Sequence, residues 1–592
     1  MFDNARDPDA VRQYVPGIGH ATAIITSTDK RFVELGSPIE ITSFSRQEAI
    51  AYLHERTGLD DVGGATSVAE EFGDLPLALA AASATIIARG YGFTQYLLLL
   101  HNRVRDALPR RPGQDYPRDV EAALLLAVDI VCTEDSYGLN RTLLEIISVL
   151  ASDGVSRHLL YRLAEDRFVD AALERCVSGS VLSFSLSHSA VTMHPLIARV
   201  VRERLASTRR LEYVIADGLL FLGLDLHDYR PTLHRTGVVT EASAHIDALW
   251  CNAVGTENRE LLAGVLDARA SAVWQLTSVV ANLSEAIDRG ERTFADAEQV
   301  LGAQHPVTLQ CRHNLGVAFH SAGRVHDALF HLGQTLRVCE EVLGHDHELT
   351  LLTSLRFNTA CQSAGFDVCE AMERSLADFE RVLGFDHPHT LVCRSDLALA
   401  YRDTGRLVDA IELGEQNVRD FCRILGEQDP QSLSARSNLA CALTASGRHE
   451  EALPLLERVL TDRRRVLGTD HRDTLHSVHN LASAYPHVGR LDEAIDLLEA
   501  NLANRERVLG TDHPDVLLAR NNLAGAYLSA GRADEAVELF ARALADCKRI
   551  LSPGHPLTAT IRQNLDRTDP APNGLDNSAR QQAAHGESPL AD

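Results

Sequence analysis

The stretch TDHPDVLLARNNLAGAYLSAGRADEAVELFARAL, from Thr511 to Leu544, decides the fold because the chain contains it more than once. A similar stretch, TDHRDTLHSVHNLASAYPHVGRLDEAIDLLEANL, stands 42 residues earlier, from Thr469 to Leu502. Self-similarity at a fixed period is the signature of a repeat architecture, in which each unit buries the apolar face of its neighbours. The C-terminal half is therefore predicted to be a stack of short units.

Two markers define the period. One is a residue in a His-Pro-like turn, which recurs every 42 residues except for a step of 40 between His347 and His387. The turn residues are His305, His347, His387, Asp429, His471, His513 and His555, and the second marker is Gly323, Gly365, Gly405, Gly447, Gly489 and Gly531. The histidines are too far apart for the short ligand spacings of zinc sites, so we expect them to begin helices.

Each unit is predicted to be a pair of helices. Leu315, Ala318, Phe319 and Ala322 fall at i, i+3, i+4 and i+7, which is one face of a helix. Glycine at position 323 suits the left-handed residue that ends such a helix. The units around Gly365 and Pro486 depart from the pattern, and local kinks are expected there.

The composition favours packed helices over sheets. The chain has 592 residues, too many for one core, and is 45% hydrophobic but only 5% aromatic. A formal net charge of −25 opposes binding to nucleic acid or to an anionic membrane. No apolar run approaches the roughly 20 residues of a membrane helix. The eleven scattered cysteines fit reduced thiols in the cytoplasm.

The repeated pattern NLGVAF…AGR…DAL…VLG…H resembles tetratricopeptide repeats of the long, 42-residue variety found in kinesin light chains. The resemblance covers residues 263–566, about half of the chain. It implies a mainly α protein with a right-handed superhelix, whose concave face is lined by the first helices and binds an extended peptide of a partner protein.

A column of asparagines marks the expected peptide groove. An amide both donates and accepts, so a column of amides can hold a peptide backbone with little dependence on its sequence. The predicted groove residues are Asn314, Asn438, Asn480, Asn522 and Asn564, with His479 and Asn521 beside two of them. The alternative is that these amides only tie neighbouring helices together. Arg356 and Asp396 replace asparagine in two units, so the column is interrupted.

Residues 1–208 contain no repeat. Ser45 and Glu48 are spaced as a capping box ahead of an amphipathic helix. A Gly-Asp-Leu-Pro break at residues 73–76 precedes an apolar helix, and SVLSFSLSHSAVTMH, residues 180–194, is typical of two short strands around a turn.

The order of these segments resembles the back portion of an NB-ARC nucleotide switch of the STAND class, which is often joined to tetratricopeptide repeats. FDNARDP resembles the end of its Walker B strand and places Asp3 at the acidic position, while IITST resembles its sensor strand at Thr26. GDLPLAL resembles the GLPL motif, which implies that Pro76 lies near the adenine. VTMHPLIARVV resembles the M-H-D motif, which implies that His194 contacts ADP, although Pro195 replaces the aspartate.

The resemblance implies a domain order along the chain. Residues 1–42 would be an α/β remnant, 43–117 a helical ARC-like domain, and 118–208 a winged helix. Residues 209–262 would connect these to the repeats, and the Pro- and Asp-rich tail, 567–592, is expected to be disordered.

A phosphate-binding loop is missing from this sequence. Such a loop needs the pattern G-x-x-x-x-G-K-[ST], and neither lysine, Lys30 nor Lys548, lies in one. We therefore expect no ATP hydrolysis, no metal site and no required cofactor. A fragment of a longer protein and a degenerate, nucleotide-free switch both remain compatible with this sequence.

Three functions remain open. We favour a non-enzymatic signalling or regulatory scaffold that binds a peptide or protein in its groove. The first alternative is a switch that still binds ADP, with the loop supplied by a longer parent or another chain. The second is a winged-helix DNA regulator in which Arg202 and Arg204 contact phosphate, which the net charge disfavours.

Overall fold

A computed structural model describes residues 44–105, 118–133, 135, 138–185, 187–223, 235–279, 283–511, 514–550 and 556–568. The predictions for Asp3 and Thr26, and almost all of the predicted tail, lie outside these residues. The described chain is mainly helical, as predicted, and divides into two compact units. Within the described ranges, no helix has the length and apolar character needed to cross a membrane.

The first unit extends to Ser148 and resumes from Ser152 to Leu211. It opens with the helices α2 (Arg46–Thr57), α3 (Val62–Glu71), α4 (Pro76–Arg89) and α5 (Phe93–Arg105). The predicted capping box is confirmed, because Glu48 N–H donates to Ser45 Oγ at 3.3 Å and Ser45 N–H donates to Glu48 Oε2 at 2.8 Å. The predicted break before Pro76 is also confirmed, since α3 ends at Glu71.

A small sheet lies in the rest of this unit. The elements are α6 (Arg118–Thr133), α7 (Leu139–Val149), β1 (Val155–Ser156), α8 (Arg157–Leu160), α9 (Asp166–Ser178), β2 (Leu182–Phe184), β3 (Ala190–Met193) and α10 (Pro195–Ser207). The strands are antiparallel in the order β1-β3-β2, with Val155 opposite Val191 and Leu182 opposite Met193. Val191 and Met193 are buried while their neighbours are half-exposed, as in a sheet covered on one face.

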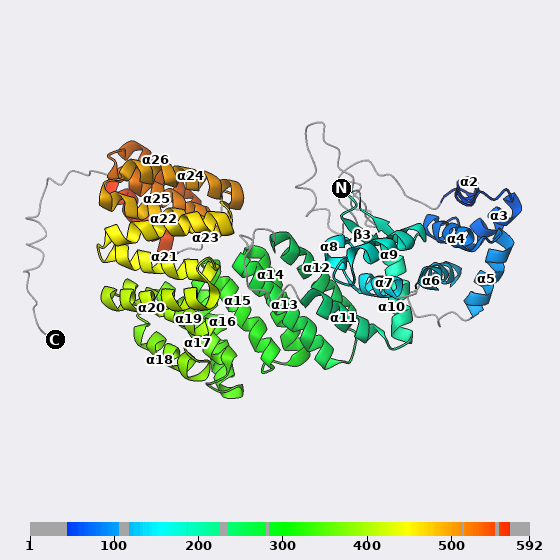
Figure 1. The fold of residues 1–592 in the computed structure, drawn as a ribbon, viewed down its shortest axis with the longest axis horizontal. Helices are drawn as coiled ribbons and strands as arrows, with labels where there is room; N and C mark the ends of the chain where they lie inside the picture. Colours follow the sequence, from blue (N-terminus) through cyan, green and yellow to red (C-terminus); the bar gives the residue numbers. More distant parts are fainter. Residues whose placement is uncertain are drawn as a thin grey trace, which may run out of the picture. The chain divides into compact units, whose positions relative to one another are not determined.

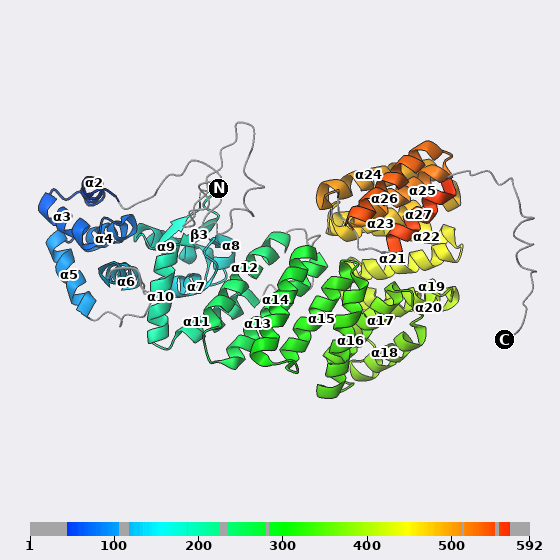
Figure 2. The same ribbon diagram turned by 180° about the vertical axis from the view of Figure 1, so that it is seen from behind.

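The second unit contains the repeats, whose helices stack in the order of the sequence from α13 to α27 (Figures 1 and 2). Two helices precede the stack, α11 (Leu211–Gly223) and α12 (Arg235–Ala253). The pairs are α13 (Arg259–Val279) with α14 (Leu283–Leu301), α15 (Pro306–Ser321) with α16 (Val325–Val342), α17 (Glu348–Ser363) with α18 (Cys369–Val382), α19 (Pro388–Asp403) with α20 (Leu407–Leu425), α21 (Pro430–Ala445) with α22 (His449–Val466), α23 (Arg472–Ala484) with α24 (Leu491–Leu509), and α25 (Pro514–Ser529) with α26 (Ala533–Ile550), followed by α27 (Pro556–Thr568).

Contacts within the stack are local. From α15 to α25, each first helix contacts the second helix of its own pair and the second helix of the preceding pair. Small residues permit this approach. A Cβ on Gly316 would lie 2.7 Å from the side chain of Leu332, and Ala440, Ala482 and Ala524 are fully buried.

Both departures from the pattern change the helices locally, although as a 3₁₀ turn and a shortened helix in place of the kinks that were expected. Because proline lacks an N–H, Pro486 cannot donate the α-helical hydrogen bond to the carbonyl four residues earlier. The first helix α23 accordingly ends at Ala484 and is followed by a 3₁₀ turn, η2 (Tyr485–Val488). In the unit around Gly365, α18 begins only at Cys369 and has 14 residues, compared with 18 in α16.

An aromatic clamp that was not predicted from the sequence joins consecutive pairs. The guanidinium of Arg406 lies 4.0 Å from the ring centre of Tyr401, and the Tyr401 hydroxyl donates to Glu373 of the preceding pair at 2.7 Å. The same arrangement recurs at Tyr485 with Arg490 and Glu457, and at Tyr527 with Arg532 and Glu499. Each arginine directly follows a marker glycine, so the turn also positions the clamp.

Replacement of Gly531 by alanine tests the turn geometry. Gly531 has a φ of +76°, where an L-residue is strained, so Gly531→Ala is expected to lower the free energy of unfolding by about 1 kcal/mol. Gly525 is the matched control, because it lies inside α25 and an added Cβ meets nothing within 4 Å. Gly525→Ala should raise stability by about 0.5–1 kcal/mol, measured by urea denaturation. Equal effects of the two substitutions would contradict this account.

Candidate functional site

The repeated histidines begin helices. In each described case the ring Nδ1 accepts a hydrogen bond from the backbone N–H two residues later, which satisfies one of the unpaired donors at a helix start. The histidines and their distances are His305 at 3.2 Å, His347 at 3.2 Å, His387 at 3.3 Å and His471 at 3.2 Å, and Asp429 does the same at 2.9 Å. The predicted role at helix entry is confirmed for these positions.

His194 has the same geometry as these capping histidines. Its Nδ1 accepts from Leu196 N–H at 3.1 Å, and Pro195 occupies the first position of α10. The ring therefore has a structural role that needs no nucleotide, and only Nε2 remains for another partner. Pro76 similarly occupies the first position of α4 and is exposed.

The arginines of α10 do not form an open basic surface. Arg202 Nη1 donates to the backbone carbonyl of Ser148, and Arg204 Nη1 lies 2.5 Å from the carboxylate of Asp129. Arg199 also pairs with a carboxylate one turn away, at 3.0 Å. These contacts stay within the first unit and occupy the groups that would contact a phosphate backbone.

The asparagines of the last repeats form a ladder between consecutive first helices. We define the amide ladder as the hydrogen bonds that join residues 43 positions apart on α21, α23, α25 and α27. They are Asn480 Nδ2 to Ser437 Oγ at 3.2 Å, Asn522 Nδ2 to His479 Nδ1 at 3.2 Å, and Asn564 Nδ2 to Asn521 Oδ1 at 2.9 Å. The structure thus brings together five of the seven predicted groove residues.

Asn314 lies apart from this ladder. Its side chain is only 4% exposed, its Nδ2 donates to the Ala270 carbonyl on α13 at 2.8 Å, and its Oδ1 accepts from Gln310 at 2.8 Å. The amide is therefore used to tie two helices together, which was the alternative considered from the sequence.

An ion pair replaces the ladder where the asparagines are interrupted. Arg356 on α17 lies 3.5 Å from Asp396 on α19, so the two substituted positions contact each other. Burial raises the pKa of the Asp396 carboxyl, and the charge of Arg356 opposes that shift. Beside Asn314, His313 Nδ1 contacts Thr353 Oγ1 at 2.9 Å, which also links consecutive first helices.

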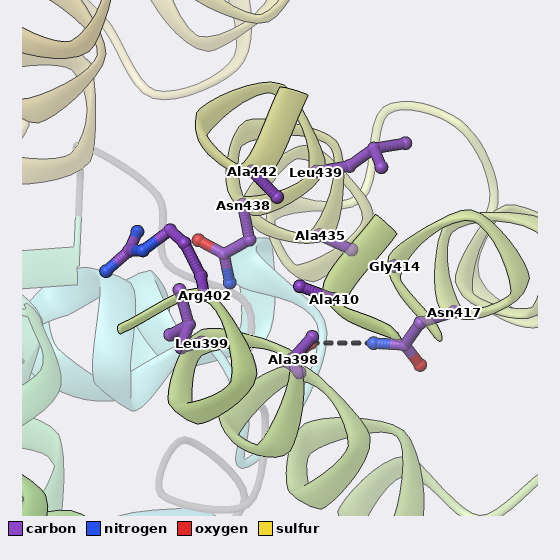
Figure 3. Close-up of a pocket in the computed structure, with 11 residues that line it drawn as sticks. Ala398, Leu399, Arg402, Ala410, Gly414, Asn417, Ala435, Asn438, Leu439 and Ala442 are labelled. Atoms are coloured by element: carbon purple, nitrogen blue, oxygen red, sulfur yellow. Dashed lines mark hydrogen bonds between the residues drawn. The ribbon is translucent and has the colours of Figure 1, made fainter. Parts of the chain in front are cut away.

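Asn438 is the predicted groove residue whose amide has no hydrogen bond to any described residue. It is half-buried beside Arg402 and Leu399, with α20 forming another wall of a small hollow (Figure 3). The cavity volume is about 10 Å³, which is room for roughly one water molecule. The hollow is therefore too small for a small-molecule ligand.

The comparisons with known proteins identify the repeats. Family models described as tetratricopeptide repeat match residues 281–341, 390–431, 432–473, 473–548 and 518–567. The chain is a tetratricopeptide-repeat protein. This confirms the repeat prediction that was made from the marker glycines and histidines. Among curated proteins, none matches this chain.

Solved structures similar to this tetratricopeptide-repeat protein include three of different kinds. TPR-like repeats of a putative kinesin light chain from Podosopora anserina are 31% identical, covering 34% of this chain and 97% of that one, with a TM-score of 0.29. A STAND protein with a tetratricopeptide repeat sensor from Pyrococcus horikoshii is 12% identical over 89% of this chain and 75% of that one, with a TM-score of 0.39. The quorum sensor NprR from B. thuringiensis is 14% identical over 60% and 99%, with a TM-score of 0.35.

The buried histidines predict a dependence of stability on pH. Burial lowers the pKa of His313 to about 3, and the charge of Arg356 adds to this effect. Because the folded-state pKa lies below the unfolded value of about 6.5, the stabilisation is complete above pH 6.5 and is lost as the pH falls toward 3. The free energy of unfolding should therefore fall between pH 7 and pH 4, and His313→Asn should reduce this slope. His345→Asn is the control, since the His345 side chain is 80% exposed, and an equal slope in both variants would contradict the assignment.

Proposed function

We propose that the first helices α21, α23, α25 and α27 bind an extended peptide segment of a partner protein. The observation that supports this is the amide ladder, which runs from helix to helix along the stack. An extended peptide presents an N–H and a carbonyl at regular intervals, and such groups pair with side-chain amides.

The ladder leaves hydrogen-bonding capacity for such a peptide. The Asn480 side chain uses one N–H on Ser437, and an amide has two N–H donors and an acceptor oxygen. Asn438 adds an amide that makes no hydrogen bond with the described part of the chain. Because these hydrogen bonds would be made to the peptide backbone, specificity for the peptide sequence would come from the side chains around the ladder.

Removal of two ladder amides tests the proposal. Peptides selected from a random phage-displayed library on the intact chain would be measured by fluorescence anisotropy. The double variant Asn480→Ala, Asn522→Ala is expected to weaken binding roughly tenfold, which corresponds to about 1.4 kcal/mol. The matched control is Gln416→Ala, since Gln416 is an exposed amide on the second helix α20. If the double variant binds as tightly as the control, while circular dichroism shows both folded, the groove lies elsewhere.

We also infer that residues 118–208 have winged-helix architecture. The order of helices and the antiparallel sheet β1-β3-β2, in which β2 pairs with β3, support this reading. The contacts of Arg202 and Arg204 within the unit favour a structural role for this segment over binding to DNA.

The nucleotide alternative is tested by releasing bound ligands from the purified, denatured chain. Because His194 Nδ1 caps α10, we expect no stoichiometric ADP by chromatography. Stoichiometric ADP that disappears in His194→Ala but persists in His305→Ala would contradict this expectation and support a retained switch. The second variant is the matched control, since His305 caps a repeat helix with the same geometry.

A further inference from the structure

A buried arginine occurs at the same position of three first helices. The residues are Arg394 on α19, Arg436 on α21 and Arg520 on α25. Arg436 follows Arg394 by 42 residues, and Arg520 follows Arg436 by 84 residues, which is two repeats. Their exposed fractions are 1%, 8% and 1%. Each faces the preceding second helix. On that second helix, Glu380 faces Arg394, Cys422 faces Arg436 and Glu506 faces Arg520. These three residues have the same spacing along the chain as the arginines. The cysteine therefore occupies a place that otherwise holds a carboxylate.

Two of these arginines are neutralised by two carboxylates each. Arg394 lies 3.2 Å from Glu380 and 2.8 Å from Asp420. Arg520 lies 2.6 Å from both Glu506 and Asp546. A buried charge is tolerated only when it is paired and hydrogen-bonded, so these carboxylates stabilise the joints between pairs.

Arg436 lacks this environment. Its Nη2 lies 3.2 Å from the Cys422 sulfur, and its buried Nη1 has no hydrogen-bond partner among the described residues. Asp462, which is in register with Asp420, pairs with arginines of its own helix instead. The carboxylate that does reach Arg436 is Glu427, at 3.4 Å, but this side chain is 63% exposed and also pairs with Arg458 at 3.0 Å.

We propose that Cys422 is a site of oxidation by hydroperoxides, and that its sulfinate replaces the missing glutamate beside Arg436. The Arg436 guanidinium already contacts the Cys422 sulfur, so a negative charge that oxidation places there would be paired. Cys422 is half-buried, as are Cys132, Cys361 and Cys441, whereas the remaining cysteines other than Cys251 are buried. Cys422 is set apart by its place opposite a buried arginine whose Nη1 has no hydrogen-bond partner among the described residues.

The reaction proceeds in two balanced steps. The thiolate sulfur attacks one oxygen of hydrogen peroxide, the S–O bond forms as the O–O bond breaks, and the departing hydroxide takes a proton to give water. A second peroxide oxidises the sulfenate to the sulfinate and again leaves as water. Sulfur loses two electrons in each step, and the product carries one negative charge on two oxygens, as a carboxylate does.

The sulfinate would complete the series of buried ion pairs. Its oxygens would accept from the Arg436 guanidinium, as Glu380 and Glu506 accept from Arg394 and Arg520. Oxidation at this position is therefore expected to strengthen the joint between α20 and α21, whereas oxidation of a buried apolar thiol would weaken its surroundings.

The experiment treats the purified full chain with hydrogen peroxide and follows each cysteine by peptide mass spectrometry, with dimedone to trap the sulfenate. Cys422 is expected to be oxidised roughly tenfold faster than Cys251, which is exposed, and Arg436→Met should remove this difference. Faster oxidation of Cys251, or an unchanged Cys422 rate in Arg436→Met, would overturn the proposal.

A second measurement does not depend on the folding of Arg436→Met. The thermal midpoint of the wild-type chain should rise when Cys422 carries the sulfinate, and the midpoint of Cys422→Ser should not rise with peroxide. Cys422→Glu, which restores the residue found at positions 380 and 506, should melt above Cys422→Ser without peroxide. The proposal would be overturned if Cys422→Glu melted below Cys422→Ser, or if the sulfinate form melted below the untreated wild type. Either result would show that no acidic group is accommodated beside Arg436.

Discussion

The burial of each first helix from α15 to α25 between two second helices is the constraint on which the repeat region depends. An isolated helix pair would leave one face of its first helix in water, so each pair is completed only by its neighbour. Close approach makes this possible, as at Gly316, where a side chain would collide with Leu332. Polar contacts then fix how the pairs sit on one another. The clamp of Tyr401, Arg406 and Glu373 and the amide ladder both span consecutive pairs and set their register.

Much of the fold follows from the sequence because its signals are local. The glycine turns, the helix starts at His305 and Asp429, the capping box at Ser45 and the break at Pro486 each involve residues within a few positions. The candidate site is less predictable, since its hydrogen bonds join residues 43 or 44 positions apart. Asn314 and Asn480 occupy equivalent positions in the repeat, yet one meets the Ala270 carbonyl and the other meets Ser437. No pattern in a single unit distinguishes these surroundings.

Charged and titratable groups inside the stack serve mainly to hold neighbouring helices. Arg394 and Arg520 use carboxylates from two different second helices, and Arg356 with Asp396 replaces an amide contact by an ion pair. Buried ion pairs add little net stability but penalise alternative arrangements, in which a charge would be left unpaired. The repeated histidines hold the backbone instead, because their Nδ1 atoms accept from N–H groups at the starts of the first helices.

The unit around Gly365 lacks the clamp, because Cys361 and Phe366 stand where the units of Tyr401, Tyr485 and Tyr527 have tyrosine and arginine. Its second helix is also short. The unit around Gly447 has Leu443 in place of the tyrosine but keeps Arg448. Since stability in a stack is a sum over neighbouring interfaces, the unit around Gly365 is expected to contribute less to it than the units that have both the clamp and a full-length second helix. Under mechanical load the stack should part there first, with the pairs on either side remaining folded as separate blocks. The opening reaction that lets amide hydrogens exchange with solvent should accordingly have a lower free energy for α17 and α18 than for α25 and α26.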